Sequence, residues 1–166
     1  MWRAAQARPG EWLCMLGSTL ALVASFLPYF GIPPVSLWQS ILLSLRPEYA
    51  STEAIVTAFL TMQLLLLSMS FLACFATFLL PQQWNILPVY QMLSGLALGC
   101  YVCIACAGLF FLWVGAQIAS EPLTAADLGL VLGLVHIGAW LVPAGLILAL
   151  FGGGKLLKQR EMKAGG

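Results

Sequence analysis

Hydrophobic residues dominate this chain in four long stretches, and charged residues are absent from the centre of each stretch. The stretches run over residues 12–30, 54–80, 88–119 and 125–151. At about 1.5 Å per residue, even the shortest forms a helix of ~28 Å, close to the ~30 Å hydrocarbon core of a bilayer. The pattern therefore predicts an all-α integral membrane protein, a single domain of four transmembrane helices in an antiparallel bundle.

Prolines mark the ends of the first three predicted helices. Pro28 should bend or end the first helix, because a proline inside a helix removes a hydrogen bond and clashes with the preceding turn. Pro81 follows the second helix, and Pro88 suits the first turn of the third, where its missing N–H has no helical partner anyway. The short connection between them predicts that the second and third helices are antiparallel neighbours.

The fourth predicted helix has a capping signal at its start and glycines at its end. Thr124 and Asp127 form a variant of the capping box, in which a hydroxyl and a carboxylate satisfy the first free N–H groups. The glycine triplet at 152–154 is expected to stop the helix. Residues 152–166 then form a basic cytoplasmic tail.

A shorter amphipathic segment lies between the first and second predicted helices. Between Val35 and Leu45, apolar residues recur at helical spacing and face serine and glutamine residues on the other side. The segment is too short to span a bilayer. It predicts a short helix lying at the membrane interface and anchored by Trp38, or alternatively a partly ordered loop covering the bundle.

Composition and charge support a membrane location and give an orientation. Charged residues make up only 8% of the chain, whereas a soluble domain has about 25%. Six of the seven Lys and Arg residues lie at the two ends, and Arg46 lies between the first two helices. The positive-inside rule therefore predicts that both termini are cytoplasmic, and the short loops suit a prokaryotic cytoplasmic membrane. The basic tail is expected mainly to set this topology, and a net charge of +1 indicates no nucleic-acid partner.

Small residues recur at regular spacing in the third and fourth predicted helices. They are Gly95, Gly99, Cys103 and Ala107 in the third helix, and Gly129 and Gly133 in the fourth. Helices in lipid associate by close contact, which small residues permit. These residues are therefore predicted to form helix-packing faces, either inside the bundle or against another membrane protein or a second copy of the chain.

Three cysteines in the third helix, Cys100, Cys103 and Cys106, have the spacing C-x2-C-x2-C. The spacing matches part of an iron–sulfur motif, but the fourth cysteine that such a motif needs does not follow. We therefore expect inert, buried packing residues and no metal site.

The single histidine, His136, falls near the middle of the fourth predicted helix. An ionisable group inside a membrane is a functional candidate, and this one could ligate haem, hydrogen-bond a quinone or relay a proton. The other interpretation is structural: a neutral His136 hydrogen-bonded across the bundle, at the level of Ser68, Ser70 and Tyr101. One histidine cannot supply two axial haem ligands, and no acidic residue lies at that depth.

Three further residues complete the candidate ligand site around His136. Trp140 follows one turn later and is expected to pack on it, and Tyr101 lies at its level. Gln63 lies deep in the second helix and needs a hydrogen-bond partner. No residue pattern identifies a particular cofactor.

In outline, four spans with cytoplasmic ends resemble the quinone-coupled disulfide-forming membrane proteins. Those proteins depend on cysteine pairs outside the membrane, and residues 31–53 and 120–128 contain no cysteine. Small multidrug exporters are also four-span proteins but use a membrane-embedded glutamate in the first span, where this chain has only Glu11 at the edge. Neither resemblance supplies the functional residues.

No catalytic motif names a reaction, so we predict no enzymatic activity. The first hypothesis is a non-enzymatic accessory, assembly or scaffold component that packs against other membrane helices. The alternative is a small carrier or redox accessory protein that binds an apolar ligand, quinone or haem near His136.

Overall fold

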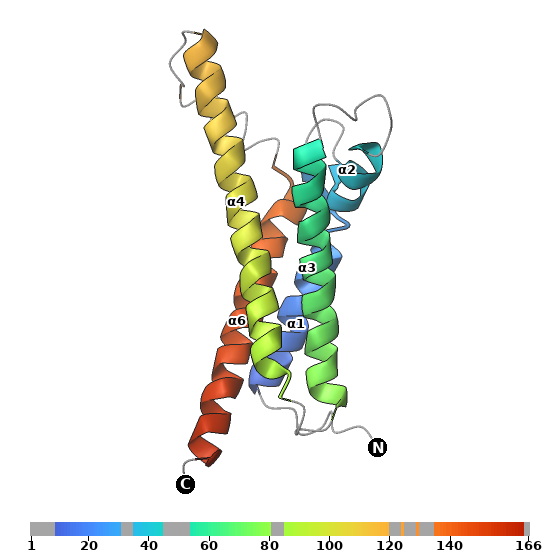
Figure 1. Ribbon diagram of the computed structural model, residues 1–166, viewed down its shortest axis with the longest axis vertical. Coiled ribbons are helices and arrows are strands. Elements are labelled where there is room, and N and C mark those ends of the chain that lie inside the picture. The colour runs from blue at the N-terminus through green and yellow to red at the C-terminus, as the bar shows by residue number, and fades with distance from the viewer. Residues whose placement is uncertain are drawn as a thin grey trace.

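The computed structural model describes residues 9–30, 35–44, 54–80, 85–119, 124, 129 and 135–164. Five helices dominate this part of the chain: α1 Pro9–Ala24, α2 Leu37–Ser44, α3 Ala54–Leu79, α4 Leu87–Ala119 and α6 Ile137–Ala164. The four long helices lie side by side along one axis, and α4 extends past the others at one end (Figure 1). The predicted all-α fold is confirmed, with one small β-hairpin in addition.

Helix α1 is shorter than the sequence predicts, since it ends at Ala24 rather than near residue 30. The three residues after it each donate their N–H to the carbonyl three residues earlier, which tightens the last turn. Pro28 then ends the helix, because it has no N–H and disfavours a helical residue before it. The chain continues as strand β1 Pro28–Phe30, which pairs antiparallel with β2 Val35–Ser36.

Helix α2 confirms that a short helix lies between the first two long helices. The Ser36 N–H donates to Gln39 Oε1 at 2.9 Å, and the Gln39 N–H donates to Ser36 Oγ at 3.2 Å. This reciprocal pair is a capping box of the S-x-x-Q type, which sets the start of α2. Leu37 and Ile41 are buried whereas Trp38 is exposed, so α2 lays one apolar face on the bundle.

The bounds of α3 and α4 agree with the predicted helices to within one residue. Pro88 is the second residue of α4, where its missing N–H costs no helical hydrogen bond. The 33 residues of α4 make a helix of about 50 Å. Such a helix is longer than a hydrocarbon core and must tilt or protrude from a bilayer.

Helix α6 begins at Ile137, and Val135 and His136 are not helical, so the predicted helix over 125–151 is not continuous. Of its first ten residues, only Gly129 lies within the described residues, and it is helical. Thr124 is not helical, and its predicted capping partner Asp127 lies outside the described residues. Val135 lies in a β-bridge, and the His136 N–H donates 3.1 Å to the carbonyl of Tyr29. The backbone before α6 is thus hydrogen-bonded to the β-hairpin, and the helix starts only after it.

The prediction that glycines 152–154 end the last helix is also wrong, because α6 continues through them to Ala164. The predicted tail is therefore helical over its described part. A methyl group on Gly152 would lie 2.7 Å from the backbone nitrogen of Cys14, and one on Gly153 would lie 2.5 Å from Gln91 Nε2. These two glycines allow neighbouring groups to approach the helix rather than ending it.

Helices α1 and α6 form the closest helix pair, and they run antiparallel. Small residues at every seventh position lie opposite one another: Gly10 and Gly152, Gly17 and Gly145, Ala24 and Gly138. A methyl group on Gly17 would lie 2.6 Å from the carbonyl oxygen of Gly145 and closer still to the nitrogen of Ala149. The two backbones are therefore in direct contact, as small residues allow for helices packed in lipid.

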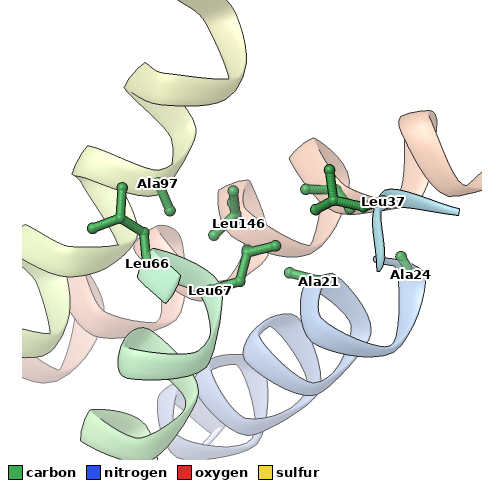
Figure 2. Packing of buried hydrophobic residues seen from close by; sticks show 8 residues of the cluster. Ala21, Ala24, Leu37, Leu66, Leu67, Ala97 and Leu146 are labelled. Atoms are coloured by element: carbon green, nitrogen blue, oxygen red, sulfur yellow. The ribbon is translucent and has the colours of Figure 1, made fainter. Parts of the chain in front are cut away.

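The apolar core lies between these four helices and is covered by α2. Figure 2 shows side chains from all five helices pointing toward one another: Ala21, Ala24, Leu37, Leu66, Leu67, Ala97 and Leu146. A second buried cluster includes residues near the start of α1 and the end of α3: Cys14, Cys74, Leu87, Tyr90, Ala149 and Leu156. The bundle is thus packed at two levels along its axis.

Three of the described helices are long and apolar enough to cross a membrane: Ala58–Leu79, Leu87–Gly115 and Ile137–Gln159. Helix α1 has only 16 residues and is shorter than such a span. Three of the four predicted spans thus correspond to membrane-type helices, and the four-span bundle stays a prediction.

Candidate functional site

Two of the four candidate ligand residues, Tyr101 and His136, are linked through Tyr29 and Ala139 next to the β-hairpin. The Tyr101 hydroxyl donates a hydrogen bond of 2.5 Å to the carbonyl of Ala139 in the first turn of α6. The Tyr101 ring stands nearly perpendicular to that of Tyr29, with centroids 6.4 Å apart. His136 joins them through its backbone, which donates to the Tyr29 carbonyl and accepts from the Ala139 N–H at 3.0 Å. We name Tyr29, Tyr101 and His136 the tyrosine–histidine cluster.

His136 does not occupy the position that the sequence predicts. It was expected inside the fourth helix at half depth, but it precedes the first residue of α6 and is half-buried. A helix N-terminus carries free N–H groups, and the His136 carbonyl accepts one of them, from Ala139. The expectation of a histidine in mid-helix is therefore wrong, and the predicted ligand role of His136 and Tyr101 stays a prediction.

The serines expected at the level of His136 bond elsewhere. The Ser70 hydroxyl pairs with that of Ser94 at 2.6 Å, which joins α3 to α4 in the middle of the bundle. The Ser68 hydroxyl donates to the carbonyl of Leu64 in its own helix at 2.9 Å. Neither of these two bonds involves His136.

The remaining ligand candidates are Trp140, which is exposed, and Gln63, which is buried. Trp140 is 58% exposed and therefore presents its ring outward. Gln63 is fully buried, and neither its amide nitrogen nor its amide oxygen has a hydrogen-bond partner among the described residues. The predicted partner of Gln63 is thus missing, and burial of an unpaired amide is costly.

A second polar group, which the sequence analysis did not find, lies inside the cluster of Cys14 and Cys74. The hydroxyls of Ser18 and Tyr90 are 3.0 Å apart, and the Tyr90 hydroxyl also lies 3.4 Å from the carbonyl of Cys14. The Cys14 thiol points to the carbonyl of Ala149 at 3.8 Å. These contacts join α1, α4 and α6 in the second buried cluster.

The expectation that the cysteines of the third helix are buried is wrong for two of them. Cys103 and Cys106 are exposed on α4 and Cys100 is half-buried, whereas Cys14 and Cys74 are each about 1% exposed. Within the described ranges, no group of three or more His, Cys, Asp or Glu side chains is placed to hold a metal ion.

This difference in burial predicts a difference in thiol reactivity. In mild detergent, N-ethylmaleimide is expected to modify Cys103 and Cys106 at least tenfold faster than Cys14 and Cys74, because access of the reagent controls the rate. Peptide mass spectrometry after timed quenching measures the rates, and labelling in denaturing detergent provides the control in which all five cysteines react. Equal protection of Cys103 and Cys106 would show that another surface covers α4.

The glycines predicted as packing residues in α4 do not contact a neighbouring helix closely. A methyl group on Gly95 or Gly99 would meet no atom within 4 Å, and the same holds for Gly129. Cys103 and Ala107 are exposed, and Gly133 lies outside the described residues. Close packing of these glycines is therefore not observed among the described residues, and packing against another molecule stays a prediction. The seven-residue spacing shared by α1 and α6 was the signal that sequence reasoning missed.

The outer half of α4, residues 102–118, exposes large apolar side chains among those that the structure describes. Of the three membrane-type helices, α4 is buried least, with only 6% of its most apolar window inside the bundle. Large apolar side chains project from several sides: Val102, Leu109, Phe110, Trp113 and Ile118. Phe110 and Trp113 lie next to each other, with ring centroids 6.2 Å apart. We name this surface the outer α4 surface.

Comparison of the chain with known proteins finds no matching family, no matching curated protein and no matching solved structure. The tyrosine–histidine cluster and the outer α4 surface are therefore the features of the chain that bear on its function.

Proposed function

We propose that the chain is an integral membrane protein of four spans that acts as a non-enzymatic accessory, assembly or scaffold component. In this proposal it packs against another membrane protein through the outer α4 surface. The observation that carries the proposal is the exposure of apolar side chains on several sides of α4 between Val102 and Ile118.

The pairing of α1 with α6 supports a fourth span. Close contacts run from Gly10 against Gly152 to Ala24 against Gly138, so α1 lies beside the membrane-type segment of α6 over almost its whole length. If that segment of α6 crosses the bilayer, α1 lies in the same hydrocarbon layer. Its outward residues are apolar too: Trp12, Leu16 and Val23. Helix α1 contributes about 24 Å and β1 roughly another 10 Å, which together suffice for a crossing.

The antiparallel pairing also supports termini on one side of the membrane. Because Gly10 lies against Gly152, α1 begins near the level at which α6 becomes basic. With the positive-inside rule, this arrangement favours cytoplasmic termini in a prokaryotic cytoplasmic membrane. A carboxyl-terminal green fluorescent protein fusion should therefore fluoresce, while an alkaline phosphatase fusion at the same residue should be inactive. The reverse result would invert the orientation.

Small residues within the outer α4 surface favour a helix as the partner. Cys103 and Ala107 are exposed one turn apart, and Gly99 precedes them by one turn with open space around it. Such a row lets a second helix approach closely, and the larger Phe110 and Trp113 extend the contact area. Exposed apolar residues that face lipid are normal in a membrane protein. A surface that binds a partner differs because it contacts one protein at defined residues.

Photo-crosslinking in native membranes tests the proposal. A photoreactive phenylalanine analogue at Phe110, which is 57% exposed, is expected to give a discrete protein adduct. The matched control places the same analogue at Leu72 of α3, which is 64% exposed but lies outside the outer α4 surface. The mass of the adduct distinguishes a different protein from a second copy. Absence of an adduct at Phe110, or equal adducts at both positions, together with a monodisperse monomer in mild detergent, would contradict the proposal.

The second candidate function is binding of an apolar ligand, quinone or haem near His136. The convergence of Tyr101, Tyr29 and His136 favours it over other ligand sites. An absorption spectrum and mass spectrometry of lipid extracts from purified protein test it. A purified chain with no bound ligand, and a His136→Ala chain with full activity in cells, would exclude it.

A further inference from the structure

The last turns of α6 change from apolar to basic along one exposed helix face. Four exposed residues share this face: Phe151, Lys155, Lys158 and Met162. They follow one another at spacings of four, three and four residues, and the helix remains regular through Ala164. The Lys155 ammonium lies 4.6 Å from the centroid of the Phe151 ring. The face therefore passes from an aromatic ring to cationic groups within one helical turn.

Trp12 marks the same level on the neighbouring helix. Gly10 lies against Gly152, so Trp12, which follows Gly10 on the antiparallel helix α1, lies near the level of Phe151. Trp12 is 47% exposed and Phe151 is 58% exposed. Exposed aromatic rings at one level are typical of the boundary between acyl chains and headgroups. Lys155 and Lys158 then lie one to two turns beyond that boundary, at the level of the headgroups.

We propose that this face binds the phosphate of an anionic phospholipid headgroup, with Lys155 and Lys158 as its cationic contacts. The inference rests on the proposed membrane location. Charge complementarity selects an anionic over a zwitterionic lipid, at about 1 kcal/mol for each basic residue near the surface. The aromatic ring beneath Lys155 adds a cation–π contact that holds the ammonium beside the glycerol and phosphate region. The positive-inside rule explains why basic residues occur here, whereas their alignment over Phe151 on one exposed face defines a binding surface.

Native mass spectrometry of the full chain tests the inference. Delipidated protein in mild detergent receives equal amounts of palmitoyl-oleoyl phosphatidylglycerol and the corresponding phosphatidylcholine. The unsubstituted chain is expected to bind more of the anionic lipid, and Lys155→Gln is expected to reduce this preference about 5-fold. The double variant K155Q/K158Q should reduce it roughly 25-fold, whereas the double arginine variant should retain it.

Arg46→Gln is the matched control, because it removes the same charge from a connection between helices. An equal loss in this variant, or an unchanged preference in K155Q/K158Q, would overturn the inference. Alkaline carbonate extraction separates the two proposals. Release of the unsubstituted chain into the supernatant would contradict the proposed membrane location itself. Retention in the pellet, together with an unchanged lipid preference in K155Q/K158Q, would contradict only the headgroup site.

Discussion

Replacing Gly17 by alanine is expected to lower the stability of the folded chain by about 1–3 kcal/mol, despite the higher helix propensity of alanine. The added methyl group would lie 2.6 Å from the carbonyl oxygen of Gly145 and would also collide with the backbone of Ala149. Backbone atoms cannot rotate away, so α1 and α6 must separate along their contact. Thermal unfolding in mild detergent, followed by size-exclusion chromatography after heating, measures the effect.

Gly95→Ala is the matched control, since a methyl group there meets no atom within 4 Å. This variant should be unchanged or slightly stabilised, by up to about 1 kcal/mol. Ala149→Gly should fail to rescue Gly17→Ala, because the obstructing atoms belong to the backbone. A Gly17→Ala chain as stable as the unsubstituted one would show that α1 and α6 are not in close contact.

Replacing Gln63 by leucine is expected to stabilise the chain by about 1–3 kcal/mol. The Gln63 side chain is fully buried, and both ends of its amide lack a partner among the described residues. Leucine has a similar volume and carries no group that must lose its hydration, so the desolvation cost disappears. The same thermal assay measures the shift.

Gln91→Leu supplies the comparison for the same chemical change. The Gln91 amide donates 3.2 Å to the carbonyl of Leu150, so this substitution should destabilise by about 0.5–1.5 kcal/mol. The two variants are thus expected to shift stability in opposite directions. Destabilisation by Gln63→Leu would show that the buried amide binds something, such as an internal water or a ligand.

The two middle helices were predictable because local signals and apolar length agree. Proline at 81 and at 88 brackets a short connection, and the apolar stretches on either side are longer than a span. Helices α3 and α4 therefore begin and end within one residue of the predicted positions. Hydropathy decides such cases without knowledge of the neighbours.

The end of α1 and the start of α6 were not predictable from hydropathy. Hydrogen bonds between segments that are distant in the sequence decide where these two helices end and begin. The β-hairpin takes up the backbone after Ala24, and its Tyr29 carbonyl accepts the N–H of His136. Apolar residues continue past Ala24 and precede Ile137, so hydropathy alone does not locate these two helix ends. The glycine triplet at 152–154 predicted a helix end where α6 in fact continues. Glycine is typical both of a helix end and of a close contact between helices, so the local sequence does not separate the two cases.

The candidate site was predictable only in part, because it also depends on contacts between helices. Counting residues along each helix placed Tyr101 at the level of a mid-helix His136, whereas the Tyr101 hydroxyl bonds the carbonyl of Ala139 in the first turn of α6. Depth counting failed for Ser70, which bonds Ser94 instead. Neighbouring helices can be rotated or shifted by a turn, so matching depth does not determine which side chains face each other.

The pairing of α1 with α6 also imposes an order on biosynthesis. Cys14 and its acceptor Ala149 are 135 residues apart, and the main partner of the first helix is the last one to be synthesised. At translation rates of ~5–20 residues per second, α1 waits on the order of 10 s in the nascent chain before that partner exists. During this interval the glycine-lined face of α1 has no α6 to cover it. Ribosome stalling or premature termination before residue 137 would therefore leave a fragment whose first helix lacks its main contact.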